Sequence, residues 1–266
     1  MMLEGFADEA VREIAARLDT VRESGVRIGF AIESGSRAWG FPSPDSDYDC
    51  RFVYIRPVRD HLGLVPVRDV IEFPIVGDID TGGWDLKKAL LLALKGNAVI
   101  VEWVKSPFVY EEEPGFRQRL DTVLAAIMVP AKVCAHYHGL LQRFGLRAAD
   151  EPVILKKLLY GVRPAVALEW MRQRNYASLP PMNLLEVLDQ TDVPGDARAA
   201  ILELVETKKI TREMGEGMPP PPLFDFMARV DARYRDAAPG DHGPVSRQAE
   251  EIAAAYYRDE VERQAE

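Results

Sequence analysis

The chain has 266 residues, of which 47% are hydrophobic and 28% charged, which is enough for one large domain or two modest ones. No stretch approaches the ~20 apolar residues of a membrane span, since the run at residues 89–94 stops at Lys95, so a transmembrane protein is excluded. A formal charge of −9 argues against broad, nonspecific coating of nucleic acid, although a local basic groove is compatible with it.

Two sequence features bear on where in the cell the protein is expected. The first residues carry acidic side chains among apolar ones and lack a basic segment followed by an apolar stretch and a cleavage site, so we expect no ordinary secretion. Cys50 and Cys134 are too few for a disulfide framework or a structural zinc cluster. We therefore expect a cytoplasmic protein whose fold is stabilised by burial.

The first hundred residues alternate between helix and strand signals. Apolar periodicity and the segment rich in Gly, Ser and Pro before Asp47 predict adjacent strands joined by a structured loop. The strand that begins at Val70 either ends at residue 76 or continues to Trp84. The predicted elements, in chain order, are a helix over residues 7–23, strands over 27–33, 48–55 and 70–76, and a helix over 85–96.

From about Pro107 onward, strand signals are scarce and helical periodicity recurs. The proline run at residues 219–222 predicts an extended connector. We expect a domain boundary near residues 107–115, where Pro, Gly and the acidic residues 111–113 indicate a solvated linker. The predicted helices cover residues 116–128, 130–145, 152–175, 183–190, 195–209 and 245–262.

Residues 34–52, SGSRAWGFPSPDSDYDCRF, carry the pattern most informative about chemistry. Side chains at i and i+2 of a strand share a face, so Asp47 and Asp49 project together, with Cα atoms roughly 6–7 Å apart. Gly35 lets the backbone approach a phosphate, and Ser36 adds a hydroxyl and an N–H group. Magnesium takes oxygen ligands and keeps phosphate oxygens in its shell, so a phosphate cradle facing two carboxylates is chemically coherent. The competing interpretation is a turn with a loop glycine.

This stretch resembles the signature of the DNA polymerase beta-type nucleotidyltransferase superfamily: Gly-Ser or Gly-Gly, about ten residues, then Asp-x-Asp. More closely, GSRAWGFPSPDSDYDCRFVYIRP, GWDLKKALLLALKGNAVIVEWVKSPFVY and LLYGVRPAVALEWM are similar to the RNA repair pathway DNA polymerase beta family. The similarity runs from about residue 28 to 210. It implies an α+β fold, in which a small mixed sheet with helices forms a catalytic domain over residues 1–110, and a helical domain over 111–266 closes the nucleotide site.

The resemblance also implies transfer of a nucleoside monophosphate from a nucleoside triphosphate to an acceptor hydroxyl, with release of pyrophosphate and with Mg²⁺ or Mn²⁺ as cofactor. Asp47 and Asp49 match the signature carboxylates, and Gly35 and Ser36 match the phosphate-binding pair. By the family description the acceptor is an RNA end, while a small molecule or a protein side chain stays chemically open. The alternative is a nucleotide-sensing or partner-binding module with little transfer.

The superfamily also has a third carboxylate, for which Asp85 is the first candidate and Asp80 the second. Asp85 is expected as a catalytic metal ligand, but its side chain would alternatively cap the following helix by accepting from N–H groups at Lys87 or Lys88. The two aspartates have opposite strand parity, so one regular strand could not aim both at the same cations.

Basic side chains supply further candidates for nucleotide binding. Arg37 follows the Gly-Ser pair and is expected to contact the triphosphate through its planar guanidinium, with a solvent-facing or core-bridging role as the alternative. Lys156 and Arg163 lie about two turns apart on one predicted helix and are expected to neutralise phosphate charge, with a solvated face as the alternative. Lys157, Tyr160, Arg172 and Arg174 belong to the same helix, which is the densest basic segment and the expected surface for RNA.

Overall fold

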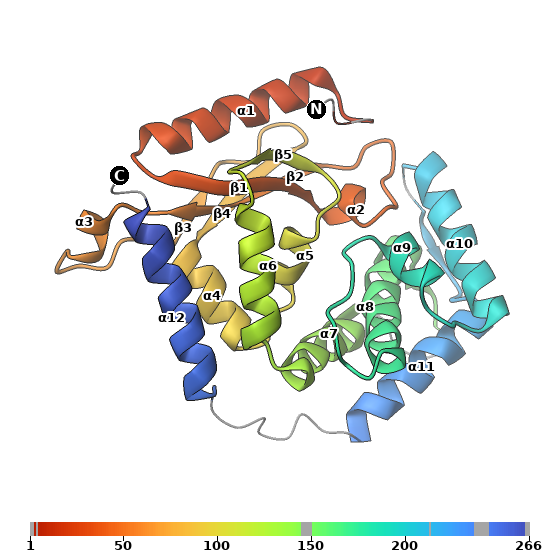
Figure 1. The fold of residues 1–266 in the computed structure, drawn as a ribbon. Helices are drawn as coiled ribbons and strands as arrows, with labels where there is room; N and C mark the ends of the chain where they lie inside the picture. The colour runs from red at the N-terminus through yellow and green to blue at the C-terminus, as the bar shows by residue number, and fades with distance from the viewer. Residues whose placement is uncertain (1–2, 4, 145–150, 213, 237–244, 264–266) are drawn as a thin grey trace.

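The computed structural model describes residues 3, 5–144, 151–212, 214–236 and 245–263. Its centre is a five-stranded sheet with the strand order β3-β4-β2-β1-β5 (Figure 1). β2 runs parallel to β4, and the other neighbouring strands are antiparallel, so the sheet is mixed. The α+β class is thereby confirmed. The strands are β1 (Arg27–Ser34), β2 (Tyr48–Ile55), β3 (Val70–Glu72), β4 (Ile79–Asp85) and β5 (Val109–Glu112).

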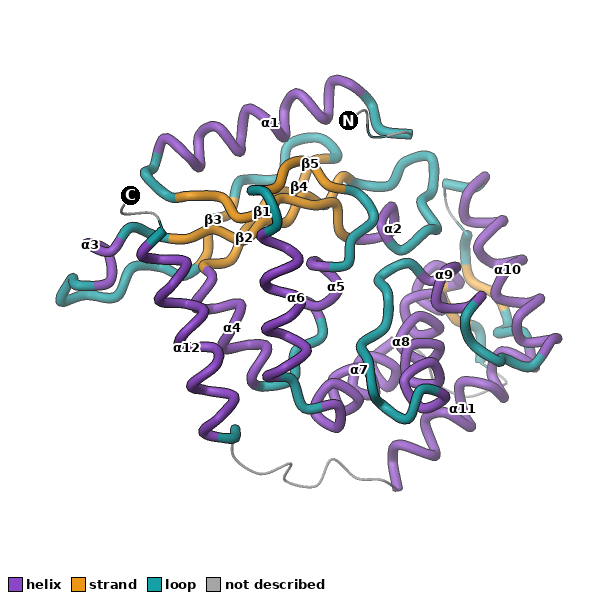
Figure 2. The backbone as a smooth tube through the Cα atoms, viewed as in Figure 1, coloured by secondary structure: helices purple, strands orange, loops and turns teal. Residues whose placement is uncertain are grey.

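Helices cover both faces of this sheet, as Figure 2 shows. Because successive strand residues point to opposite faces, Phe52 and Tyr54 of β2 pack in the core under α1, while Val53 and Ile55 pack in the larger core on the other side. Cys50 lies in the α1 core as a free, buried thiol. The covering helices are α1 (Asp8–Glu23) on one face and α4 (Leu86–Leu94), α5 (Val99–Val104), α6 (Phe116–Ile127) and α12 (Arg247–Glu262) on the other.

A second group of helices stands beside the sheet, with α8 at its centre (Figure 1). α8 contacts α7, α9, α10 and α11. Its turns from Leu158 to Met171 are buried almost all round, which is typical of a helix enclosed by others. The group comprises α7 (Pro130–Phe144), α8 (Leu155–Gln173), α9 (Leu184–Asp189), α10 (Gly195–Ile210) and α11 (Pro221–Asp236), with the small strands β6 (Val153–Ile154) and β7 (Glu216–Gly217).

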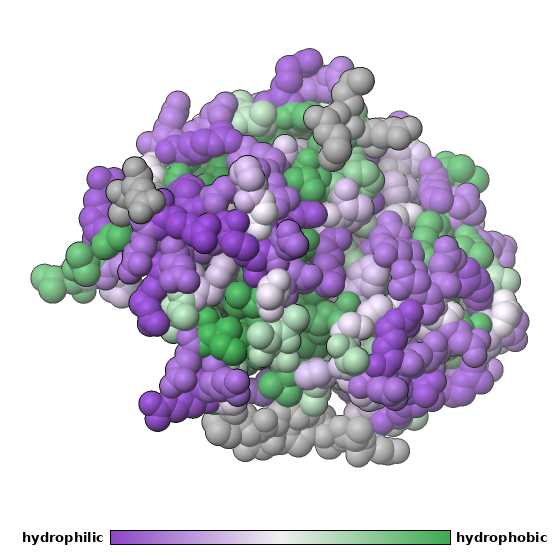
Figure 3. Space-filling view, viewed as in Figure 1, coloured by the Kyte–Doolittle hydropathy of each residue, from purple (hydrophilic) through white to green (hydrophobic). Residues whose placement is uncertain are grey.

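Two short helices and one apolar loop complete the described chain. They are α2 (Gly35–Ala38), directly after β1, and α3 (Val58–His61). The loop between α3 and β3 exposes Leu62, Leu64 and Val65, and Figure 3 shows this tip in green beside hydrophilic surface. In the described ranges no single helix has the length and apolar composition to cross a membrane; α6 and α7 meet that test only as a pair, which is bent by 100°.

Several predicted elements need correction. Residues 111–113, interpreted as a linker, belong in part to β5, which pairs with β1, so the predicted domain boundary falls on a strand of the sheet. α6, assigned to the helical domain, packs on β1, and α12, assigned there too, packs on α6 and α4. The strand begun at Val70 is two strands, which turn at Gly77. The proline run is a connector only over residues 219–220, because α11 begins at Pro221, where the first turn needs no N–H donor. Residue 145, predicted to end a helix, lies outside the described residues.

Candidate active site

A cavity of about 390 Å³ lies between the sheet and the second helix group. One wall comes from the end of β1, α2, the loop before β2, and β2 itself, and the other comes from α7 and α8. The cavity therefore joins the Gly-Ser and Asp-x-Asp segments to the helix that carries the predicted basic residues. Its lining residues are Ser34, Gly35, Ser36, Trp39, Asp45, Ser46, Asp47, Asp49, Arg51, Leu140, Phe144, Lys156, Tyr160 and Arg163.

Two carboxylates line the sheet wall of the cavity, and a third lies beside one of them. Asp47 immediately precedes β2, and Asp49 lies two residues further, on the strand face that carries Val53. The parallel register of β2 and β4 pairs Asp49 with Asp80, which brings the two to neighbouring positions on one face. Burial raises the pKa of Asp49; Arg51 opposes this, while the charges of Asp80 and Asp47 add to it. The negative charges of Asp47 and Asp80 therefore disfavour ionisation of Asp49.

The Arg51 guanidinium lies between two of these carboxylates. Its Nη2 atom is 2.6 Å from Asp80 Oδ2 and 3.3 Å from Asp49 Oδ1. No group of three or more His, Cys, Asp or Glu side chains in the described residues is arranged to hold a metal ion as it stands. The donor set is nevertheless made of oxygens and already binds a cationic group, which fits a hard divalent cation.

Gly35 lies against the Asp49 carboxylate. Its φ of +67° is in the left-handed region, and a Cβ atom there would lie 2.0 Å from Asp49 Oδ2. The adjacent Ser36 donates from its hydroxyl to the Ser46 hydroxyl at 2.9 Å, which ties the turn to the loop before β2. The glycine is thus required by the carboxylate itself, a reason that the phosphate-binding interpretation did not include.

Arg37 braces the loop and does not line the cavity. Its guanidinium donates to the carbonyl oxygens of Ser46, at 2.7 Å, and Asp47, at 3.1 Å, and lies 4.0 Å from the centroid of the Tyr48 ring. Arg37 thus binds the loop before β2 and is not brought to the cavity where Lys156 and Arg163 lie.

Lys156, Tyr160 and Arg163 face the carboxylates from α8 and line the cavity. Arg163 is held in place by an ion pair with the buried Glu102 of α5, and its guanidinium lies 4.3 Å from the centroid of the Trp39 ring. Lys157 is exposed and is not a lining residue, because it projects from a different face of α8. The predicted basic helix thus supplies two cationic side chains, Lys156 and Arg163, to this wall.

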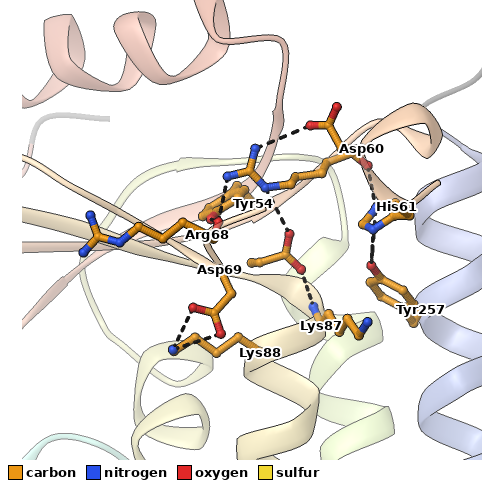
Figure 4. A network of polar contacts seen from close by, with 10 residues as sticks. Tyr54, Asp60, His61, Arg68, Asp69, Lys87, Lys88 and Tyr257 are labelled. Carbon is orange, nitrogen blue, oxygen red and sulfur yellow. Dashed lines mark hydrogen bonds and ion pairs between the residues drawn. The ribbon is translucent and has the colours of Figure 1, made fainter. Parts of the chain in front are cut away.

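Asp85 is not at the cavity. It pairs with Tyr54 at the other end of the strand pair and is the N-cap of α4, where its carboxylate accepts from the Lys87 N–H group at 2.7 Å. Figure 4 shows the polar network around Tyr54 and Lys87. Arg56 Nε lies 3.8 Å from Asp85 Oδ2. The metal-ligand prediction for Asp85 is therefore corrected in favour of its capping alternative, and Asp80 is the acidic residue beside Asp49.

Glu33 is a residue that the sequence reasoning missed. Its side chain is fully buried behind Asp49, whose backbone N–H group donates to Glu33 Oε1 at 3.0 Å, and the Tyr110 hydroxyl donates to Oε2 at 2.5 Å. Burial raises the pKa of Glu33 to about 8. The only available signal was an acidic residue within the apolar run RIGFAIE.

Lys208 of α10 was also missed. Its ammonium group is buried, donates to the Phe41 carbonyl oxygen at 2.8 Å and lies 4.6 Å from the centroid of the Phe41 ring. Burial, and secondarily the charge of Lys156, lowers its pKa to about 8. The side chain thus anchors the loop before β2 to the second helix group, and nothing in the local sequence distinguishes it from an ordinary surface lysine.

Comparison with known proteins identifies a family and a relative. The model of the family described as the RNA repair pathway DNA polymerase beta family matches residues 11–258. A Bacillus subtilis (strain 168) protein, named uncharacterized protein YcgL, is 33% identical over 229 residues, which cover 84% of this chain and 82% of that protein.

Proposed function

Since the chain belongs to the RNA repair pathway DNA polymerase beta family, we propose that it is a nucleotidyltransferase. The reaction is transfer of a nucleoside monophosphate from a nucleoside triphosphate to an acceptor hydroxyl, with release of pyrophosphate. The observation that carries the proposal is that Asp47 and Asp49 line the cavity beside the Gly35 turn, opposite Lys156 and Arg163, with Asp80 paired to Asp49 on the neighbouring strand.

Asp47, Asp49 and Asp80 would hold Mg²⁺ or Mn²⁺ through their carboxylate oxygens. Such cations, when bound, stabilise the entering and leaving oxygens of an in-line displacement at phosphorus. On the opposite wall, Lys156 and Arg163 would bind phosphate oxygens, and the Glu102 ion pair fixes the direction of the Arg163 guanidinium before the substrate arrives.

The aromatic part of the cavity suits a nucleobase. Trp39, Phe144 and Tyr160 line it together with Leu140, and the Tyr160 ring has its neighbours edge-on, with centroids 5.6 Å from Trp39 and 6.0 Å from Phe144. Aromatic faces bind bases by stacking with little regard to base identity. We propose that this wall orients the base while the charged walls bind the triphosphate.

The acceptor we propose is an RNA end, on the strength of the family description. A small molecule that offers a hydroxyl group is the other chemical possibility. The two are separated by supplying labelled nucleotide with each acceptor class in turn.

One arrangement favours a second candidate, a nucleotide-sensing module with little transfer. Arg51 lies between Asp49 and Asp80, and the described chain holds no ready metal cluster. A sensor would bind nucleotide in this cavity without transferring it, so direct measurement of transfer discriminates between the candidates.

The test is incubation of the pure protein with each α-labelled nucleoside triphosphate, Mg²⁺, and either an RNA pool or no RNA. We expect label on RNA with wild type, and a loss of at least about a hundredfold in Asp47→Asn and Asp49→Asn, because the amide lacks the charge that binds cations. Both variants should melt at or above the wild-type temperature, since carboxylate repulsion is relieved. Turnover within about twofold of wild type in either variant would remove the assignment, and nucleotide binding without transfer by wild type would favour the sensor.

A further inference from the structure

Arg51 extends the row of charged side chains on β2. Asp47, Asp49 and Arg51 are spaced by two residues, so all three lie on the strand face toward the cavity. The guanidinium is fixed on its other side, where Nη1 donates to the carbonyl oxygens of Cys50, at 3.0 Å, and Asp80, at 3.1 Å. Arg51 is therefore a built part of the carboxylate cluster.

Arg51 forms ion pairs with two of the three carboxylates and not with the third. Asp49 and Asp80 share its Nη2 atom, at 3.3 Å and 2.6 Å, whereas the exposed Asp47 has no ion pair with it. A guanidinium and a divalent cation require the same carboxylate lone pairs and repel each other at close range. A cation that binds Asp49 and Asp80 together must therefore displace the guanidinium.

We propose that Arg51 is a built-in counter-ion, which binds Asp49 and Asp80 in the metal-free protein and competes with a divalent cation for the position between them. The inference rests on the proposed function, because it assumes that these carboxylates bind cations. Its consequence is weak cation binding in the absence of nucleotide, so that the cation at Asp80 enters together with the triphosphate, whose negative charge can bind the displaced guanidinium.

The chain offers a matched control in Arg56. Arg56 lies just beyond β2 and also bridges two carboxylates, with Asp60 Oδ2 at 3.5 Å and Asp85 Oδ2 at 3.8 Å, but it is not a lining residue of the cavity. Replacing either arginine with methionine removes one bridging charge, and only the Arg51 replacement removes it from the proposed cation position.

The test is titration of nucleotide-free protein with Mn²⁺, followed by the electron paramagnetic resonance signal of the free ion. We expect Arg51→Met to bind Mn²⁺ at least about tenfold more tightly than wild type, because a competing charge has been removed. Arg56→Met should bind as wild type does. In the double variant Arg51→Met/Asp80→Asn the increase in Mn²⁺ affinity should disappear, which would show that the increase depends on Asp80. Arg51→Gln, which keeps an amide donor for the neighbouring carbonyl groups, provides the same test if the methionine variant does not fold.

Unchanged or weaker Mn²⁺ binding in the folded Arg51 variants would overturn the proposal and make Arg51 a residue that merely positions Asp80. This failure is distinct from failure of the proposed function. If wild type binds Mn²⁺ and Asp49→Asn does not, the cation site stands and only the role of Arg51 is wrong. If neither wild type nor the Arg51 variants bind Mn²⁺, both proposals fall.

Discussion

Gly35 shows how one missing side chain makes room for a charged one. The space that its Cβ would fill belongs to the Asp49 carboxylate. Gly77 provides a comparison, since it has a φ of +58° and a Cβ there would meet nothing within 4 Å. The two glycines thus have similar backbone conformations, and only one of them contacts the proposed site.

We predict that Gly35→Ala displaces the Asp49 carboxylate and lowers nucleotide transfer by at least about tenfold, because a misplaced ligand loses most of its effect. Gly77→Ala should keep wild-type transfer. Each variant should lose about 1 kcal/mol of stability from the left-handed backbone, and Gly35→Ala should lose more. Transfer rates and urea melts of both variants provide the check, and equal transfer by the two would contradict the role given to Gly35.

Lys208 gives a prediction about pH. Its pKa of about 8 in the folded protein lies below the ordinary value of 10.5, so between these values the unfolded chain holds a proton that the folded chain has released. The free energy of unfolding should therefore rise with pH in this window, by about 2 kcal/mol between about pH 8 and 9.5. Below about pH 8 the lysine is charged in both states and contributes no slope.

Lys208→Met should remove this rise, because methionine does not titrate. Urea unfolding of wild type and variant at about pH 7 and about pH 9.5 measures the difference. The cost of the substitution should be larger at the higher pH, where wild type has been relieved of the buried charge but keeps its hydrogen bond to Phe41. An identical cost at both pH values would show that the lysine titrates normally.

At the scale of elements, the register of β4 decides which aspartate belongs to the site. The odd separation in sequence between Asp80 and Asp85 on one strand showed that the two side chains could not both face the cations. The spacing alone does not say which of them does. Parallel pairing with β2 places Asp80 beside Asp49 and leaves Asp85 at the start of α4.

We predict that Asp80→Asn lowers transfer by at least about tenfold, while Asp85→Asn stays within about twofold of wild type, because asparagine caps a helix as well as aspartate does. Assays of both variants under the same conditions make the comparison. The reverse pattern would restore Asp85 as the third carboxylate.

Local patterns predicted the elements whose signals are local. The helix at Asp8–Glu23, both central strands and the Gly-Ser to Asp-x-Asp spacing could all be predicted, because periodicity and turn residues determine them. β5 escaped prediction because the residues at 111–112 look solvated until β1 pairs with them. Arg51 and Glu33 escaped because their roles depend on which side chains lie across the sheet, and this follows from register.

At the scale of the whole molecule, a chain with a net charge of −9 must bind RNA through a localised surface. In the structure, fewer basic side chains of the predicted RNA surface are free to bind RNA. Arg174 lies 4.1 Å from the centroid of the Trp170 ring and donates to the Gln190 carbonyl oxygen, and Arg172 is paired with Glu169. Lys157 stays exposed, one residue from the cavity-lining Lys156.

If RNA is the acceptor, Lys157→Glu should raise the Michaelis constant for RNA several-fold, and the effect should shrink as salt rises, because counterion release then contributes less. Lys95→Glu is the matched control, since Lys95 is exposed at the end of α4, which contributes no residue to the cavity walls. Steady-state kinetics at two salt concentrations measure both. Wild-type use of RNA by Lys157→Glu at low salt would count against this surface.

Calorimetric titration with a nonhydrolysable nucleoside triphosphate tests most directly whether the cavity is a cation-dependent nucleotide site. We predict binding to wild type with Mg²⁺ present, at least about tenfold weaker binding when a chelator replaces Mg²⁺, and no response to Mg²⁺ in Asp49→Asn. Equal affinity with and without Mg²⁺ in wild type, or an unchanged Mg²⁺ response in Asp49→Asn, would contradict the claim.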